Sequence, residues 1–113
     1  MTNSAMEQKP VMTVTPAVNI VETPHSFIVS LDIPGAMKDR IKANIENNSL
    51  VIAADIVNTT DAGNAVPEKQ YRREFSLAND IDTNSVEAQF ELGVLSVTLK
   101  KLEKYVPKQI HIH

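Results

Sequence analysis

Histidine is the first residue type in this sequence whose spacing suggests chemistry. His111 and His113 flank Ile112, and this i, i+2 spacing places both rings on one face of an extended segment. With His25 they would offer three imidazole ligands to a metal ion. Structural zinc sites usually need four placed ligands, often cysteines, and the chain has no cysteine. Solvated histidines are therefore the favoured interpretation, and no metal site is predicted.

Paired carboxylates are the second candidate, because Asp80 and Asp82 lie two residues apart in a polar stretch. Acid/base catalysis would need a nucleophile and a pocket beside them, and the sequence indicates neither. The three glycines form neither a GxxxxGK[ST] nor a GxGxxG phosphate-binding loop. We therefore expect no catalytic residue, no bound cofactor and no enzymatic activity.

A small basic cluster, Lys69, Arg72 and Arg73, is the third candidate. Glu68 and Glu74 interleave with it, a pattern typical of a solvated strand face. The whole chain carries 14 acidic and 11 basic residues, for a net charge of -3. This charge builds no positive field, so nucleic acid is not an expected partner.

Length and composition then limit the fold that must position any site. At 113 residues the chain has room for one domain. It lacks cysteine, and it contains no apolar stretch near the roughly 20 residues that cross a bilayer. We expect a cytoplasmic protein without a membrane span or signal peptide. Only 4% of the residues are aromatic, so branched aliphatic side chains must build the core, which favours sheet.

Apolar residues recur with period two along most of the chain, as Val29, Leu31 and Ile33 do. Turn-forming pairs such as Pro34-Gly35 interrupt the pattern. Residues 58–67 are predicted as an exposed loop, and residues 79–85 as a polar connection. No helix is expected. Seven strands are predicted, at residues 18–20, 27–33, 41–46, 50–54, 71–77, 86–90 and 95–99. Short strands at this spacing predict an all-β sandwich or barrel.

The two ends differ from this pattern. Residues 1–16 are predicted to form a flexible arm, whose apolar points are Met6, Val11, Met12 and Val14. Residues 102–113 form a polar tail that ends in Ile110-His111-Ile112. Ile110 and Ile112 project to the same side of an extended segment and need an apolar groove to cover them.

Four segments, in this order, resemble the signatures of the small heat-shock proteins, which share an α-crystallin domain. Residues 32–41 resemble D-L-P-G-x-x-K-E-x-I, residues 71–77 resemble F-x-R-x-F-x-L, residues 88–95 resemble A-x-x-x-x-G-V-L, and residues 110–112 resemble the C-terminal I-x-I motif. Any one of these matches alone would be weak. Together they cover about residues 17–112 and identify the chain as a member of that family.

The resemblance implies a two-sheet antiparallel immunoglobulin-like sandwich over residues 17–101, between the arm of residues 1–16 and the tail of residues 102–113. It implies an ATP-independent chaperone that holds unfolding client proteins and assembles with itself as dimers and higher oligomers. Two departures leave the size and mode of assembly open: the arm is short, and the loop at residues 56–70 is shorter than the loop by which many bacterial and plant members exchange a strand.

The resemblance also assigns roles to particular residues. Ile110 and Ile112 of one subunit would dock into a groove of another, formed by Ile41, Ala43, Ile45, Val86, Ala88 and Phe90. Arg73 would lie at the dimer interface, or else be an ordinary exposed strand arginine. The apolar residues of the arm, Met6, Val11, Met12 and Val14, are candidate client contacts.

Two other functions compete with the chaperone. One is an adaptor subunit, similar to a co-chaperone, that binds one fixed protein partner and holds few clients; the I-x-I tail argues against it. The other is a small hydrolase or ligand-binding sandwich, for which the sequence supplies no nucleophile with a base.

Overall fold

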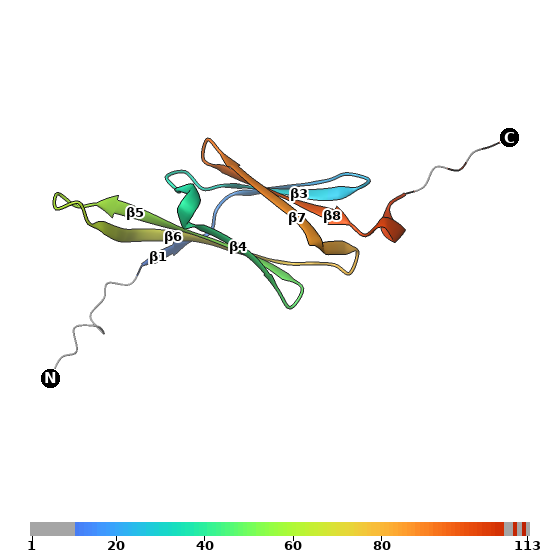
Figure 1. Ribbon diagram of the computed structural model, residues 1–113, viewed down its shortest axis with the longest axis horizontal. Coiled ribbons are helices and arrows are strands. Elements are labelled where there is room, and N and C mark those ends of the chain that lie inside the picture. Colours follow the sequence, from blue (N-terminus) through green and yellow to red (C-terminus); the bar gives the residue numbers. More distant parts are fainter. Residues whose placement is uncertain (1–10, 108–109, 111, 113) are drawn as a thin grey trace.

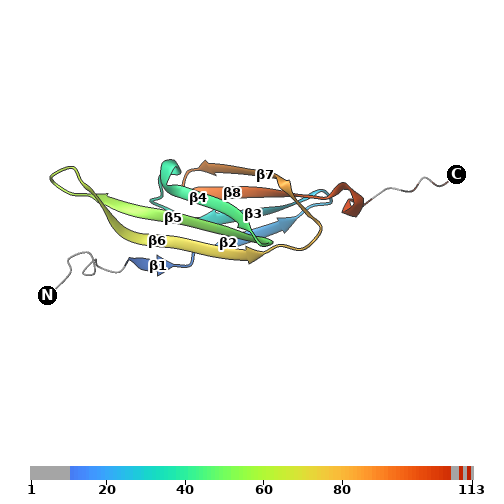
Figure 2. The ribbon, with the colours of Figure 1, turned by 60° about the horizontal axis from the view of Figure 1, so that its bottom comes forward.

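The computed structural model describes residues 11–107, 110 and 112, and these residues form two four-stranded sheets packed face to face (Figures 1 and 2). The first sheet has the order β1 (Met12–Val14), β6 (Ala65–Ser76), β5 (Ser49–Thr59), β4 (Ile41–Glu46). The second has the order β2 (Val18–Glu22), β3 (Ser26–Asp32), β8 (Val94–Lys101), β7 (Ile81–Glu91). Two 3₁₀ turns complete the described elements, η2 (Lys38–Arg40) and η3 (Glu103–Tyr105).

Strand pairing is antiparallel at every described contact except that of β1 with β6, which is parallel. Direct connections join the antiparallel pairs β2–β3, β4–β5, β5–β6 and β7–β8, and the chain crosses from one sheet to the other after β1, β3 and β6. The predicted all-β, two-sheet antiparallel sandwich is confirmed.

The core follows the period-two pattern of the sequence. Leu31 pairs with Leu95 and Val29 with Val97, so aliphatic side chains of neighbouring strands meet on the inner face of the second sheet. The first sheet contributes Leu50 and others from β5 and β6. The buried core consists of Val29, Leu31, Ile33, Leu50, Ile52, Ala54, Ile56, Tyr71, Ile81, Leu95, Val97 and Leu99. Each large aliphatic member contributes roughly 1.5–3 kcal/mol by leaving water.

The predicted loop at residues 58–67 is exposed throughout, as expected, but strand pairing extends into both of its ends. β5 continues to Thr59 and β6 begins at Ala65, so the two strands form a long hairpin that closes at residues 60–64. In this turn the Gly63 amide donates to the Thr60 carbonyl over 2.8 Å, and the Thr60 amide to the Asn64 carbonyl over 2.8 Å. Pro67 made the segment look unlike a strand, but it pairs with Val57 directly beside the register shift between Ile56 and Val57, an irregularity at which a proline is tolerated.

The predicted polar connection at residues 79–85 is partly strand. β7 already begins at Ile81, which pairs with Lys101 before an irregularity that resumes the ladder at Val86. The Asp82 carboxylate holds this irregular stretch, because it accepts the Asn84 amide over 3.0 Å and the Ser85 hydroxyl over 2.9 Å. The candidate catalytic carboxylate thus has a local structural role.

Candidate functional site

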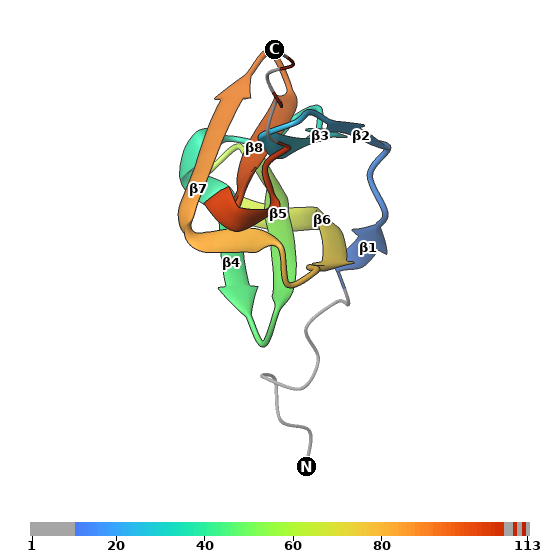
Figure 3. The same ribbon diagram turned by 90° about the vertical axis from the view of Figure 1, so that its right-hand side faces the viewer.

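An apolar groove lies where the two sheets leave an open edge. β4 ends the first sheet and β7 ends the second, and both lie on the same side of the sandwich (Figure 3). Between them is a cleft of about 160 Å³. Its lining consists of Lys38, Ile41, Ala43, Ala88, Gln89, Phe90 and Leu95.

Four of the six residues predicted for the docking groove line this cleft: Ile41, Ala43, Ala88 and Phe90. The other two, Ile45 and Val86, are half-buried against the core, as Ile41 and Phe90 are, but they do not line the cleft. The motif-based prediction missed Leu95, although its pairing opposite Phe90 follows from the two-residue turn at Leu92-Gly93. Lys38 and Gln89 are also new, and they give the groove a polar rim.

The family signatures position the groove because they contact one another around Pro34. The Tyr71 hydroxyl donates to the Pro34 carbonyl over 3.3 Å, and the Ile33 amide donates to the Gly93 carbonyl over 2.8 Å. Gly35 has φ +87°, a conformation that glycine adopts without strain. The turn therefore carries the chain from the second sheet to η2 and then to β4, one wall of the groove.

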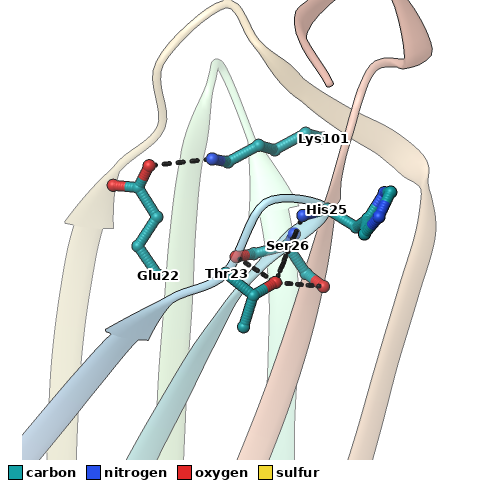
Figure 4. Close-up of polar contacts among 5 residues, drawn as sticks. All are labelled: Glu22, Thr23, His25, Ser26 and Lys101. Atoms are coloured by element: carbon teal, nitrogen blue, oxygen red, sulfur yellow. Dashed lines mark hydrogen bonds and ion pairs between the residues drawn. The ribbon is translucent and has the colours of Figure 1, made fainter. Parts of the chain in front are cut away.

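The tail begins from a fixed point on the second sheet. The Lys101 amide donates to the His25 carbonyl over 2.8 Å, and the Leu102 amide to the Asp80 carbonyl over 2.7 Å. The Lys101 ammonium contacts a Glu22 carboxylate oxygen at 2.8 Å, although only 8% of the lysine side chain is exposed (Figure 4). We call this set of contacts the tail root.

The turn before β3 braces the tail root. The Thr23 hydroxyl oxygen accepts the amides of His25, over 3.2 Å, and Ser26, over 2.9 Å (Figure 4). This hydroxyl-capped turn orients the His25 carbonyl that accepts the Lys101 amide. The predicted docking motif lies farther along the tail, where Ile110 is 84% exposed and Ile112 is 94% exposed.

Arg73 lies on the core-facing side of β6, opposite Ile52, and is half-buried. Its guanidinium carbon is 5.5 Å from the centre of the Phe75 ring. On the same strand Arg72 pairs with Glu74 at 3.6 Å, whereas Arg73 takes part in none of the ion pairs found among the described residues. Its side chain is therefore partly shielded from water, and its nearest described partner is an aromatic ring.

The predicted arm is described only from Val11 onward, so Met6 lies outside the described residues. β1 pairs with β6, with Met12 opposite Lys69 and Val14 opposite Tyr71. Val14 is half-buried against the core, while Val11 and Met12 are exposed. Periodicity missed β1 because three residues are too few to show alternation.

The remaining chemical candidates gain no support as a site. Within residues 11–107, 110 and 112, no group of three potential metal ligands comes together, and His111 and His113 lie outside those residues. One Asp80 carboxylate oxygen, Oδ1, is buried without a hydrogen-bond partner in the described part of the chain. No helix in that part is long and apolar enough to cross a membrane.

Comparison with known proteins gives a consistent result. The Hsp20/alpha crystallin family model matches residues 19–113. The 18 kDa heat shock protein of Clostridium acetobutylicum is 41% identical over 95 residues, which cover 77% of this chain and 62% of that protein. Heat shock protein 16 of Schizosaccharomyces pombe is 28% identical over 107 residues, covering 87% of this chain and 75% of that protein. This chain thus spans less than two thirds of the clostridial protein.

Solved structures share the fold. Heat shock protein 16.0 of S. pombe aligns with a TM-score of 0.67 and 27% identity, over 89% of this chain and 77% of that one. A small heat-shock protein of Xylella fastidiosa aligns with a TM-score of 0.68 and 23% identity, over 88% and 97%. The family predicted from the four motifs is confirmed: the chain belongs to the Hsp20/α-crystallin family, that of the small heat-shock proteins.

Proposed function

We propose that the protein is an ATP-independent molecular chaperone, a holdase that binds unfolding proteins and prevents their aggregation. The observation that carries this proposal is the pairing of an open apolar groove with an uncovered aliphatic motif in the same chain. The groove is lined by Ile41, Ala43, Ala88 and Phe90, and the motif exposes Ile110 and Ile112.

Docking between subunits follows from the chemistry of the two surfaces. β4 and β7 each have one edge with no strand neighbour among the described residues, so an extended segment can add to either edge. Two isoleucines that enter the groove would each contribute roughly 1.5–3 kcal/mol if fully buried. Single contacts of that strength are reversible, so subunits exchange and grooves become available to the apolar segments of unfolding clients.

Dimer formation is the second part of the proposal. Arg73 is half-buried on β6 beside Phe75 and outside the ion pairs of its own described chain. A partially desolvated guanidinium gains most from a carboxylate held in fixed geometry. We assign Arg73 to the dimer interface, where the partner would supply that carboxylate.

The exposed residues of the arm are proposed client contacts. Val11 and Met12 are both exposed beside β6, and methionine adapts to many apolar shapes. Val14 packs against the core and is less available to clients than these two. We place this activity in the cytoplasm, in keeping with a chain that contains no cysteine.

Thermal aggregation of unrelated model clients tests the holdase. We expect equimolar or lower amounts of the protein to suppress light scattering from several heated clients with no nucleotide present, because the groove needs only apolar contacts. Added ATP should change nothing. Scattering that stays at the level of the client alone, for several unrelated clients, would refute the holdase. Capture of one stoichiometric partner without client protection would instead support the adaptor.

A further inference from the structure

A second apolar cleft lies at one end of the sandwich, next to the tail root. It measures about 250 Å³ and opens between β2 and the end of β6, far from the β4–β7 groove along the strands. We call it the tail-root cleft. Its lining is almost wholly apolar and consists of Ile20, Phe27, Val29, Phe75, Ser76, Leu77, Ala78, Ile81 and Leu99.

We propose that the tail-root cleft binds Ile110 and Ile112 of the same chain. The cleft would then be an intramolecular docking site for the tail, separate from the groove that receives the tail of another subunit. Both isoleucines are exposed by more than 80% in the structure, so they have no cover of their own. An apolar cleft within reach offers them that cover without a second subunit.

The tail root fixes the tail beside this cleft. The Lys101 ammonium lies 4.9 Å from the centre of the Phe27 ring, and Phe27 lines the cleft. Lys101 also pairs with Ile81, a second lining residue. The Leu102 amide donates to Asp80, the residue before Ile81. Figure 3, which looks onto this end of the molecule, shows the red η3 close to the start of β7.

The length of the tail permits this return. Ile110 is four residues after Val106, which directly follows η3, and an extended chain spans at most about 3.3–3.6 Å per residue. Ile110 thus reaches roughly 14 Å from Val106. Phe27 and Ile81, which line the cleft, are neighbours of Lys101 at the tail root, so the tail starts beside the cleft that it would enter.

The β4–β7 groove of the same subunit lies farther from the tail root than the tail-root cleft does. Ala88 pairs with Val97 and Phe90 with Leu95, four and six residues up β8 from Lys101. At about 3.3 Å per residue, those groove residues lie roughly 13–20 Å from the tail root. A tail that turns back on its own subunit meets the tail-root cleft first, whereas the β4–β7 groove is placed to receive a tail from elsewhere.

Intramolecular docking would compete with assembly, and this consequence rests on the proposed function. A tail held in its own cleft is not available to the groove of a neighbour. The local concentration of a tethered ligand does not depend on protein concentration, whereas docking between subunits does. Dilution should therefore shift tails from neighbouring grooves into their own clefts.

Disulfide trapping in the full chain tests the docking itself, because the protein has no cysteine of its own. One variant combines Ser76→Cys, at the cleft, with Gln109→Cys, which keeps both isoleucines. The control combines His25→Cys with Gln109→Cys, since His25 contacts the tail root but does not line the cleft. A mixture of ¹⁴N- and ¹⁵N-labelled protein distinguishes bonds within a chain from bonds between chains.

We expect the Ser76→Cys pair to oxidise within single chains roughly tenfold faster than the His25→Cys pair, because docking raises the effective concentration at the cleft above that of a free tether. Equal rates for the two pairs would overturn the proposal, as would bonds only between chains. Neither result bears on client protection, so a failure here is distinct from failure of the holdase.

A pair of matched substitutions tests the competition. Ala78 and Ala88 are both exposed, and each lines one of the two clefts. Ala78→Glu places a charge at the tail-root cleft and should shift native mass spectra toward larger assemblies at a given concentration, because it frees the tail. Ala88→Glu in the groove should shift them toward smaller ones. A shift of Ala78→Glu toward smaller assemblies, or none, would contradict the competition.

Discussion

Pro34 joins three parts of the chain that are far apart in the sequence. Its carbonyl accepts the Tyr71 hydroxyl, and its Cα lies 3.5 Å from the position that a Cβ on Gly93 would occupy. The sequence motifs contain all of these residues but do not show that they touch. Three of the signatures thus meet at one turn, the turn at Pro34 that leads the chain toward β4.

Leu92 is the residue whose type fits its backbone least. The two short hairpins of the molecule have the same geometry, with Asn47 and Asn48 in one turn and Leu92 and Gly93 in the other, all at positive φ. Asparagine and glycine tolerate this region, whereas a leucine is strained there. Leu92 is also 94% exposed, so burial in its own subunit offsets none of that strain.

Replacement of Leu92 by asparagine should therefore stabilise the protein. We expect Leu92→Asn to raise the free energy of unfolding by about 1 kcal/mol, because positive φ costs a side chain with a branched apolar body more than it costs asparagine. Thermal unfolding monitored by circular dichroism would show a rise of about 4–8 °C for a domain of this size. The reciprocal variant Asn47→Leu should lower the midpoint. A lower midpoint for Leu92→Asn would show that Leu92 makes a stabilising contact in the assembly.

At the scale of elements, period-two alternation predicted the central strands and failed at their ends. β3, β5 and β8 carry long apolar alternations and were placed correctly. The tip of the β5–β6 hairpin has the composition of a loop, yet backbone pairing with register continues through it. Whether a segment forms a strand depends on whether a neighbouring strand is there to hydrogen-bond with its backbone, and the amino-acid composition of the segment does not contain this information.

The parallel pairing of β1 with β6 is a second element that alternation did not reveal. The relative direction of two paired strands leaves no trace in the alternation of either strand, and only three residues of β1 take part in the pairing. The candidate groove was more predictable than either, because its residues belong to two strands with clear apolar faces. The polar rim of the groove could not be predicted in the same way, because Lys38 belongs to η2 and the sequence predicted no helical turn there.

Hydrogen exchange should rank these elements by their burial. We expect amides around residues 29–33, 50–52 and 95–99 to exchange slowest, because their strands have neighbours on both sides and their side chains form the core. Amides at residues 58–66 should exchange orders of magnitude faster, since the side chains at this tip are exposed and lie outside the core. Mass spectrometry of peptic fragments measures both sets. If the tip proves as protected as the core, it must be covered by another subunit.

At the scale of the whole molecule, assembly should depend on two residues that the domain does not need. The variant Ile110→Ala with Ile112→Ala removes only exposed side chains, so we expect the midpoint of thermal unfolding to change little. The mass distribution should shift to dimers and other small species, because each docked tail loses most of its apolar contact. Native mass spectrometry across temperature measures this directly.

The control for this prediction is Lys104→Ala, which changes an exposed tail residue outside the I-x-I motif. It should leave the mass distribution unchanged. Combining Ala88→Glu with the double alanine variant should add little to either, since both changes break the same contact. An unchanged mass distribution for the double alanine variant would contradict the assignment of the tail to contacts between subunits.

The tail root has one more consequence, which concerns symmetry. A tail that leaves one subunit and enters the groove of the next makes a heterologous contact, in which the two surfaces that meet are different. Such contacts close into a ring or shell when the rotation per subunit divides a full turn, and otherwise continue as an open fibre. Lys101 and Leu102 hold the tail at a set angle to its own sandwich, so they help to determine that rotation. Two backbone hydrogen bonds and one ion pair at the base of the tail would then contribute to whether the assembly closes or grows without limit.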